Sequence, residues 1–403
     1  MTAHIEKSVL CGEISAPPSK SMSHRLLILA AMSRGMCKVE NLDYSEDVLA
    51  MLDCLRALGA DCETDGSSAH IDGTNFLKNV ASDLNCRESG NTLRFMIPIC
   101  LTLGKSVTLH GSARLMERPQ GVYEDLCREQ VFTYQKGEGS VTVSGTLKSG
   151  IYTLDGSVSS QFITGMILAL LSLDGDSEIR IKPPFESRSY VDLTLRAVEI
   201  FGGTAHFSDD YTIKITGKSI QAKNVITEGD YSNAAFLDAF NYIGGAVKVN
   251  GLTEQSAQGD RVYKQHFAAL MSGSPTIDIS DCPDLGPVLM AVAALNHGCT
   301  LTGTRRLAIK ESDRGNAMRG ELRKFGCELD LRENEIIVPK AELHAPTEPL
   351  YGHNDHRIVM SLAVMCSVLG GDIDGCEAVR KTYPNFFDDI KKLGARVEHS
   401  KEA

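Results

Sequence analysis

The chain repeats one local pattern six times: an amphipathic helical segment, a break, and a short segment in which apolar residues alternate. Helical spacing of apolar residues buries one side of a helix and alternation buries one face of a strand, so each copy predicts a helix followed by a strand. Most breaks are glycines, which supply the left-handed conformation in which helices commonly end. The fold class is therefore α/β. The copies are MLDCLRALGADCE, YEDLCREQVFTY, LRAVEIFGGTAHF, HFAALMSGSPTIDI, ELRKFGCELDL and IKKLGARVE, with breaks near Gly59, Gln130, Gly202, Gly273, Gly326 and Gly394; the second and fourth are the weaker ones.

Six copies in 403 residues predict two domains with three copies each. A single hydrophobic core stops growing at about 250–300 residues, so a chain of this length divides. A solenoid is the alternative, but solenoid repeats run about 20–50 residues and need no domain break. We therefore favour compact domains with three-fold internal repetition.

Two segments are candidates for the connections between the domains. In VITEGDYSN a strand-like run ends, and Asp230 is placed to cap the helix that follows. In SAPPSKSMSHR, paired prolines stiffen the chain before an apolar helix. We expect one domain over residues 18–227 and the other over 1–17 plus 228–403, with crossings near 16–20 and 225–230.

Composition and charge exclude several classes of protein. The net charge of −11 argues against a nucleic-acid surface, which requires a basic face. The chain has neither an apolar run of about 18 residues nor a secretory leader, so we expect a cytoplasmic protein without a membrane segment. The twelve cysteines include no CxxC pair and are expected to be buried thiols. His353 and His356 form an HxxH spacing without a third ligand, so no metal site is expected.

The first chemically informative segment is PPSKSMSHR, at the start of an apolar helix. Lys20 and Arg25 stand there although the helix dipole opposes cations at this end, so a compensating anion is expected. Free amide N–H groups, two hydroxyls and two cations suit a phosphate or a carboxylate. A hydroxyl-capped surface turn is the other interpretation, and this segment alone does not decide between them.

Similar polar turns recur along the chain. In ESGNTLR, Gly90 either permits a ligand to approach the backbone or simply forms a turn. Arg118, in RLMERP, either binds an anion or pairs with Glu117 on the surface. Further turns of this kind are SVSSQ, SRSY, DCPD, KESDR, DHR and KTYP. Lys310 and Arg314 are four apart, hence on one face with Glu311 turned sideways if that segment is helical.

The ordered series resembles the 5-enolpyruvylshikimate-3-phosphate synthases, a family of enolpyruvyl transferases. The motifs that carry the resemblance are PPSKSMSHR, ESGNTLR, MERPQG, GSVSSQF, SRSY, EGDYS, QGD, CPDLGP, IKESDR, NDHR and RKTYP. Each motif is weak alone, but the series is specific and extends from Pro17 to Pro384. The resemblance implies a two-domain inverted α/β barrel-like fold, each domain built of three βαβαββ-type repeats whose helix N-termini face the interdomain cleft.

The resemblance also implies the reaction and its residues. Phosphoenolpyruvate would donate its enolpyruvyl group to the 5-hydroxyl of shikimate 3-phosphate and release phosphate, in the shikimate pathway to chorismate. Shikimate 3-phosphate would be held by Lys20, Ser21, Arg25, Ser159, Ser160, Ser187, Tyr190 and Lys310, with Asp284 near its 5-hydroxyl. Phosphoenolpyruvate would be surrounded by Lys20, Gly90, Arg118, Gln161, Arg314, Arg357 and Lys381. We expect no cofactor, no partner besides these small molecules, and a monomer.

The chemistry is addition followed by elimination, so one group must accept a proton and another must donate one. Asp284 is the candidate base toward the hydroxyl, with Glu311 and Lys20 as candidates for proton exchange at C3 of the enol. Because Gly90 is present, glyphosate, a phosphonate mimic of the donor, should compete with phosphoenolpyruvate. The role of Arg306, where some relatives carry Asn, stays open.

Two other functions are considered. The enolpyruvyl transferase that acts on UDP-N-acetylglucosamine shares the fold and the donor, but is expected to show Lys-Asn rather than Lys20-Ser21, and a reactive loop cysteine. Ser159, Ser160 and the SRSY segment favour shikimate 3-phosphate. A non-catalytic anion-binding protein is disfavoured because Asp284, Glu311 and Lys20 are all present.

Overall fold

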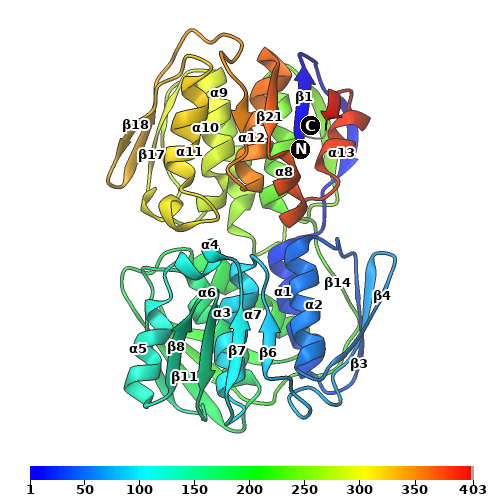
Figure 1. The fold of residues 1–403 in the computed structure, drawn as a ribbon, viewed down its shortest axis with the longest axis vertical. Helices are drawn as coiled ribbons and strands as arrows, with labels where there is room; N and C mark the ends of the chain where they lie inside the picture. Colours follow the sequence, from blue (N-terminus) through cyan, green and yellow to red (C-terminus); the bar gives the residue numbers. More distant parts are fainter. Residues whose placement is uncertain (401–403) are drawn as a thin grey trace. The chain divides into compact units, whose positions relative to one another are not determined.

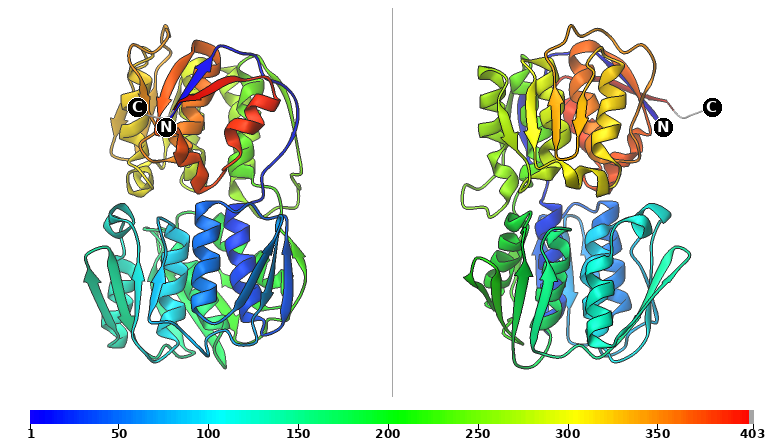
Figure 2. Two further views of the ribbon diagram at one scale, coloured as in Figure 1. Left: turned by 45° about the vertical axis from the view of Figure 1, so that its right-hand side comes forward. Right: turned by 90° about the vertical axis from the view of Figure 1, so that its left-hand side faces the viewer.

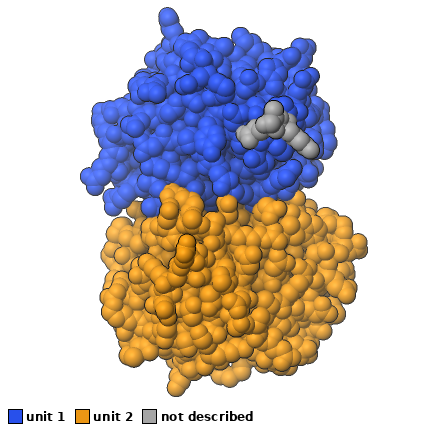
Figure 3. All heavy atoms as spheres, in the orientation of Figure 1, with its two compact units in different colours: residues 1–17, 229–403 blue, residues 18–228 orange. Residues whose placement is uncertain are grey.

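The computed structural model describes residues 1–400. The chain divides into two compact units, which are coloured separately in Figure 3. Unit 1 comprises Met1–Pro17 together with the chain from Gly229 onward, and unit 2 comprises Pro18–Glu228. Unit 1 is therefore discontinuous in sequence.

Hydrogen bonds join the two crossing segments within each unit. In unit 1, the Asp230 amide donates to the Pro17 carbonyl over 2.7 Å, and in unit 2 the Ser19 amide donates to the Glu228 carbonyl over 2.8 Å. The first strand of the chain, β1 (Thr2–Glu6), pairs in unit 1 with two strands from the last 35 residues of the sequence, as Figure 2 shows near the N label. The N-terminal segment is thus an integral part of unit 1.

Unit 2 repeats one arrangement three times. Two parallel strands are joined by a helix, and a second helix leads to an antiparallel hairpin whose last strand pairs with the second parallel strand. The first copy is α1 (Lys20–Met32), β3 (Met36–Glu40), α2 (Glu46–Ala57), β4 (Asp61–Asp65) and β5 (Ser68–Asp72), with its first strand supplied by β14 (Val225–Ile226). The second is β6 (Asp83–Asn85), α3 (Gly90–Leu101), β7 (Val107–His110), α4 (Ala113–Glu117), α5 (Gly121–Gln130), β8 (Thr133–Gly137) and β9 (Ser140–Ser144). The third is β10 (Ile151–Asp155), α6 (Ser160–Leu171), β11 (Asp176–Lys182), α7 (Arg188–Ile200), β12 (Thr204–Asp209) and β13 (Thr212–Thr216).

Unit 1 contains two complete copies and one shortened copy; its 3-10 helices are labelled η. One complete copy is β16 (Thr276–Asp278), η3 (Pro283–Leu285), α10 (Gly286–Leu295), β17 (Cys299–Thr302), η4 (Arg305–Ile309), α11 (Arg314–Arg323), β18 (Asp330–Arg332) and β19 (Glu335–Val338). The other is β20 (Leu350–Tyr351), α12 (His356–Leu369), β21 (Gly371–Asp374), η5 (Cys376–Lys381), α13 (Phe386–Lys392) and β22 (Arg396–Ser400), completed by β1. The shortened copy is β2 (Cys11–Ser15), α8 (Tyr231–Asp238), η1 (Ala239–Tyr242), β15 (Ala246–Asn250), η2 (Gly259–Val262) and α9 (Tyr263–Ser272).

The α/β class is confirmed, but the expectation of three complete copies in each domain is wrong for one of them. In the shortened copy, the chain goes from α9 directly to β16, which pairs in the sheet of the next copy. Gly273 accordingly has φ 160°, an extended backbone, rather than the expected left-handed one. Conversely, the copy without a glycine break is complete, and Val131 itself takes the left-handed conformation that ends α5, with φ 57°.

The inner helices of unit 2 are buried nearly all round. In α1, every residue from Met22 to Met32 is buried, and α3 and α6 are similar because they are apolar on all sides. The packed pairs are α1 with α7, α7 with α6, and α6 with α3, which Figure 1 shows as neighbours. Because these helices pack against one another along their length, their N-terminal residues are held in place by the core. No helix of residues 1–400 has the length and apolar character required to cross a membrane.

Candidate active site

The largest group of predicted site residues meets around Asp284 in unit 1. Its Oδ1 accepts hydrogen bonds from Lys310 Nζ at 3.0 Å and from Arg314 Nη1 at 2.9 Å. Its Oδ2 accepts one from Arg357 Nη2 at 3.1 Å. One carboxylate thus gathers three cations from two segments, the loop from Lys310 to Arg314 and the start of α12. We call Asp284, Lys310, Glu311, Arg314, Asp355 and Arg357 the Asp284 cluster.

The positions of these side chains follow from helix starts. Asp284 lies in η3 immediately before α10, while Arg314 is the first residue of α11 and Arg357 the second of α12. Asp355 caps α12 and accepts from the Arg357 amide over 2.9 Å. Because the helix dipole disfavours cations at a helix start, the two arginines need anions close by. Asp284 and Asp355 supply them.

Glu311 lies differently from the sequence expectation. The segment from Lys310 to Asp313 is not helical, since Lys310 ends η4 with extended backbone and α11 begins only at Arg314. Glu311 is therefore not turned sideways: its Oε2 accepts from Arg314 Nη2 at 2.8 Å. Arg314, 1% exposed, also donates from Nε to Asp355 Oδ2 at 2.9 Å. The arginine is fixed from three sides.

Charge and burial oppose each other in this cluster. Burial raises the pKa of Asp284, but Arg357, Lys310 and Arg314 together outweigh it and hold that pKa well below its usual range. Burial lowers the pKa of Lys310 to about 8, although Asp284 favours its charged form. Asp284 is consequently a carboxylate at neutral pH. Lys310 titrates near the upper end of the physiological range.

In unit 2, Gly90 and Arg118 lie in direct contact. Gly90 is the first residue of α3, and a Cβ built on it would lie 2.6 Å from Arg118 Nη1 and 3.1 Å from Cζ. Any side chain here would push the guanidinium aside, so the observed position of Arg118 depends on a glycine at residue 90. Arg118 is only 5% exposed, so it does not form an exposed surface pair.

Gln161 joins the same region of unit 2. Its Oε1 accepts from Arg94 Nη1 at 2.5 Å and its Nε2 donates to Asn91 Oδ1 at 2.7 Å. Arg94 also donates to the Pro119 carbonyl over 2.8 Å, next to Arg118. The first turns of α3 and α6 and the segment after α4 therefore meet.

A second group of unit 2 lies at the starts of α1 and α7. Lys20, the first residue of α1, donates to Asp47 Oδ2 over 3.0 Å. Arg25 is buried and donates to Thr194 Oγ1 at 2.8 Å and to the Tyr190 carbonyl at 2.9 Å. Arg25 thus ties α1 to α7 with protein groups as its partners.

The predicted serines occupy helix starts as expected. Ser21 is the second residue of α1, Ser159 caps α6 by accepting from the Gln161 amide, and Ser160 is its first residue. Ser187 precedes α7 in a left-handed conformation with φ 54° and makes no capping bond through its side chain. Lys381 donates over 2.6 Å to the carbonyl of Asn354, which immediately precedes Asp355 in the chain.

Four residues that contact the predicted site residues were not themselves predicted from the sequence: Asp355, Asn91, Arg94 and Asp47. Asp355 and Asn91 stand inside the quoted motifs, and the capping position of Asp355 was a usable signal. Arg94 was in a quoted motif but has no distinguishing local pattern. Asp47, the partner of Lys20, carries no signal at all, because it is 27 residues away in the chain.

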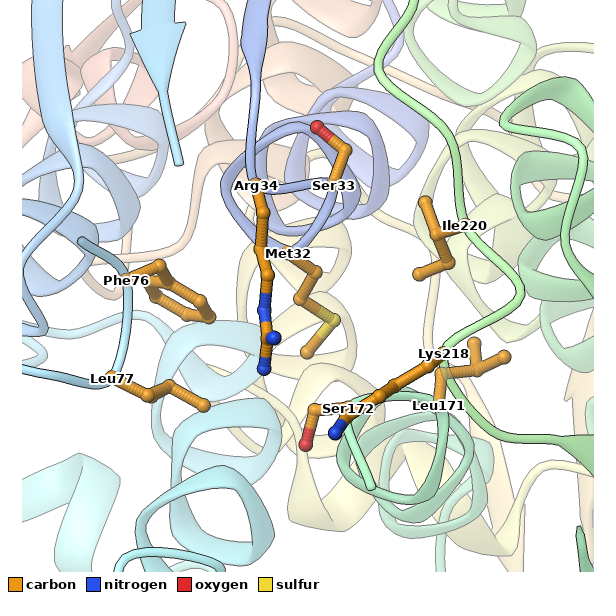
Figure 4. Close-up of a pocket in the computed structure, with 9 residues that line it drawn as sticks. All are labelled: Met32, Ser33, Arg34, Phe76, Leu77, Leu171, Ser172, Lys218 and Ile220. Carbon is orange, nitrogen blue, oxygen red and sulfur yellow. The ribbon is translucent and has the colours of Figure 1, made fainter. Parts of the chain in front are cut away.

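A cavity of about 270 Å³ lies elsewhere in unit 2, at the C-terminal ends of α1 and α6 (Figure 4). The side chains of Arg34 and Lys218 extend toward each other there, Arg34 beside Phe76 and Leu77 and Lys218 beside Leu171 and Ser172. Cations at helix C-termini are stabilised by the helix dipole, which accounts for both. The cavity is separate from the candidate site, because α1 is about 18 Å long and Lys20 is at its other end.

Side chains that could bind a metal ion do not cluster within residues 1–400. Within residues 1–400, no three His, Cys, Asp or Glu side chains are placed to hold one metal ion. His353 Nε2 contacts Glu321 Oε1 at 2.9 Å, while His356 is buried at the start of α12. The twelve cysteines are all unpaired, and every one except Cys11 is buried, as expected.

Comparison with known proteins decides the family. The model of the family described as EPSP synthase (3-phosphoshikimate 1-carboxyvinyltransferase) matches residues 5–390. The chain belongs to the EPSP synthase family. Enzymes named 3-phosphoshikimate 1-carboxyvinyltransferase from Clostridium kluyveri and Clostridium perfringens are 38% and 36% identical to it; 98% and 97% of this chain and 97% of each relative are covered.

Solved structures of this family and of a related transferase share the fold. EPSP synthase from Acinetobacter baumannii has a TM-score of 0.78 at 23% identity, covering 99% of this chain and 100% of that one. The enolpyruvyl transferase NikO from Streptomyces tendae has a TM-score of 0.80 at 14% identity, covering 100% and 99%. At these identities the likeness concerns the fold alone.

Proposed function

We propose that this chain carries out the reaction for which its family is named, 3-phosphoshikimate 1-carboxyvinyl transfer. Phosphoenolpyruvate is the donor, the 5-hydroxyl of shikimate 3-phosphate is the acceptor, and inorganic phosphate is the second product. The observation that carries the proposal is the Asp284 cluster, in which one ionised carboxylate is surrounded by three cations. It provides a proton acceptor and an anion-binding group at the same place.

Arg314 and Arg357 are proposed to bind the donor, and Lys310 the acceptor. Arginine presents a planar fork that suits carboxylate and phosphate, and both arginines belong to helix starts whose amides point the same way. Burial supports strong binding, because an anion paired with buried cations is little screened by water. Lys381, which donates to the Asn354 carbonyl, is proposed as a further donor-binding cation.

Unit 2 is proposed to supply the remaining substrate-binding groups. For the donor these are Lys20, Gly90, Arg118 and Gln161. Gly90 and Gln161 lie at the starts of α3 and α6, and Arg118, just after α4, lies against Gly90. For the acceptor they are Lys20, Ser21, Arg25, Ser159, Ser160, Ser187 and Tyr190. Arg25 has only part of its donor capacity left for a ligand, since it already donates to Thr194 Oγ1 and to the carbonyls of Ser21 and Tyr190.

The reaction proceeds by addition and elimination. The acceptor oxygen forms a bond to C2 of the donor while its proton passes to Asp284, and C3 gains a proton from Glu311 or Lys20. The resulting tetrahedral intermediate then loses phosphate from C2 as the proton leaves C3, which restores the double bond. Each proton group must therefore work in both directions.

The low pKa of Asp284 means that its basicity must rise before it can accept the proton. A carboxylate stabilised by three cations is a weak base. When substrate anions engage Lys310, Arg314 and Arg357, part of that stabilisation is withdrawn and the basicity of Asp284 rises. Substrate binding would thus activate the base.

The test is phosphate release on mixing the purified chain with both substrates. We expect phosphate only when both are present. If shikimate 3-phosphate gives none while UDP-N-acetylglucosamine does, the acceptor is wrong; if neither gives phosphate but both bind, the chain is a non-catalytic anion-binding protein. A cytoplasmic location and a monomeric state remain part of this proposal, and sedimentation tests the latter.

A further inference from the structure

Asp260 belongs to the QGD motif, to which the proposed reaction assigns no role. It lies in η2, is 2% exposed, and its Oδ2 accepts a hydrogen bond from Ser232 Oγ. In the same turn, Gln258 Oε1 accepts from the Tyr231 amide over 2.9 Å, and Gln258 Nε2 donates to the Gly229 carbonyl over 2.8 Å. The motif is therefore attached to the start of α8 at several points, and the carboxyl of Asp260 has a fixed place.

That place is beside Arg357. Ser232 and Phe236 are four residues apart on α8 and so lie on one face of the helix. Ser232 holds Asp260, while the Cζ of Arg357 lies 5.8 Å from the ring centroid of Phe236. Asp260 and Arg357 thus rest against the same face of α8. Arg357 continues to Asp284 Oδ2 at 3.1 Å.

The charged groups around Asp260 come from every neighbouring element. Burial and then the charge of Asp284 raise the pKa of Asp260 to about 7, while Arg357 and the Ser232 hydrogen bond lower it and Asp230, the cap of α8, raises it. Cys282, before η3, stays a neutral thiol because burial raises its pKa. The other titratable groups on the packed elements include Tyr231 and Asp238 on α8, Arg261 on η2, Tyr263, Lys264 and His266 on α9, and His356 on α12.

We propose that Asp260 is a positioning residue that sets the charge available at Arg357 for the donor. As a carboxylate it competes with the donor anion for the guanidinium, and as a neutral acid it leaves the guanidinium to the donor. The Asp284 cluster contains three cations and three carboxylates, so an ionised Asp260 makes the surroundings net anionic. This inference rests on the proposed function, because it takes Arg357 as a donor-binding residue.

The binding of the donor and the binding of a proton to Asp260 are thermodynamically linked, so proton uptake can be measured. If a neutral Asp260 strengthens donor binding, then donor binding must strengthen proton binding by the same factor. A shift of about one pKa unit on binding corresponds to about tenfold in affinity. Donor binding near neutral pH should therefore take up protons from solution.

The experiment compares Asp260→Asn, which keeps the shape of the side chain without its charge, with the unaltered protein. The kcat/KM for phosphoenolpyruvate is measured at saturating shikimate 3-phosphate from about pH 5.5 to about pH 8.5. The ratio of variant to unaltered protein should lie near one at the acid end and rise to about ten at the alkaline end. Ionisation of the donor and of Lys310 affects both proteins and cancels in the ratio. A ratio that does not change with pH overturns the proposal.

Calorimetry provides a readout that a purely structural role would not move. With shikimate 3-phosphate present, the proton uptake on phosphoenolpyruvate binding near neutral pH, obtained from buffers of different ionisation enthalpy, should be lower in Asp260→Asn. Equal uptake in both proteins overturns the proposal.

Should Asp260→Asn fail to fold, Ser232→Ala serves instead. Loss of the hydroxyl removes a hydrogen bond that lowers the pKa of Asp260, so the pH dependence of kcat/KM should move to higher pH. An unmoved profile overturns the proposal. Absence of phosphate release by the unaltered protein would contradict the proposed function instead, so the two failures are distinguishable.

Discussion

The contact between Gly90 and Arg118 predicts the effect of adding a single methyl group. In Gly90→Ala, the new Cβ would lie 2.6 Å from Arg118 Nη1, a distance that real Cβ atoms do not show. Ordinary contact begins at 3.4 Å, so the guanidinium must move by the difference between these distances or rotate away. Only the end of a flexible side chain has to shift, so the fold itself should survive.

The expected result is a selective loss of donor binding. Moving a binding group by about 1 Å in a site that orients its substrate can cost up to about 10²-fold in kcat/KM. We therefore expect the KM for phosphoenolpyruvate to rise by about tenfold to a hundredfold. The KM for shikimate 3-phosphate should change much less, and glyphosate inhibition should weaken in parallel with donor binding. Alanine is more stable than glycine in a helix by about 0.5–1 kcal/mol, which partly offsets the strain of moving Arg118. The free energy of unfolding should therefore change by less than about 1 kcal/mol.

Gly121→Ala is the matched control for this experiment. Gly121 is also the first residue of a helix, α5, but a Cβ there would meet no atom within 4 Å. Steady-state kinetics of both variants should separate the steric effect from the helix effect. In an Arg118→Ala background, Gly90→Ala should have almost no further effect. An unchanged donor KM in Gly90→Ala, or an equal change in Gly121→Ala, would refute the reasoning.

Three further predictions concern charged groups of the proposed site. Lys20→Met should lower kcat by about 10²-fold or more, since it removes a proposed proton carrier; near-normal turnover in a phosphate-release assay would contradict that role. Asp284→Asn should retain or tighten donor binding in a calorimetric titration, because a competitor for the cations is gone, while kcat falls by about 10²–10⁴-fold; an active variant would place the base elsewhere. Because burial lowers the pKa of Lys310 to about 8, its charge, and with it acceptor binding, should be lost as pH rises through that value. Lys310→Arg should keep acceptor binding nearly constant over the same range, and an identical pH profile for both proteins would falsify this assignment.

The local pattern of the chain already determines the secondary structure and its repetition. Apolar spacing and glycine breaks depend on residues within one turn or one strand of each other, so the helix–strand copies could be recognised without a fold. Helix starts were predictable for the same reason: Asp230 caps α8 as expected, and Lys20 opens α1. The missing hairpin after α9 was not predictable, because the segment that follows is equally strand-prone and only its pairing partner decides to which sheet it belongs.

The sequence predicted which residues stand at helix starts but not which groups they contact. The motifs named Lys20, Gly90, Arg118, Asp284 and Arg314 as candidates, since their residue types and positions suit anions. Which groups they contact depends on residues distant in the chain: Asp47 with Lys20, or Arg357 with Asp284 over 73 positions. Burial and these contacts, not residue type, make Asp284 a stabilised carboxylate and raise the pKa of Asp260 to about 7. The sequence by itself thus determined which chemistry is present, whereas the tertiary structure decided how each group is charged, because electrostatic free energies depend on distance and solvent access.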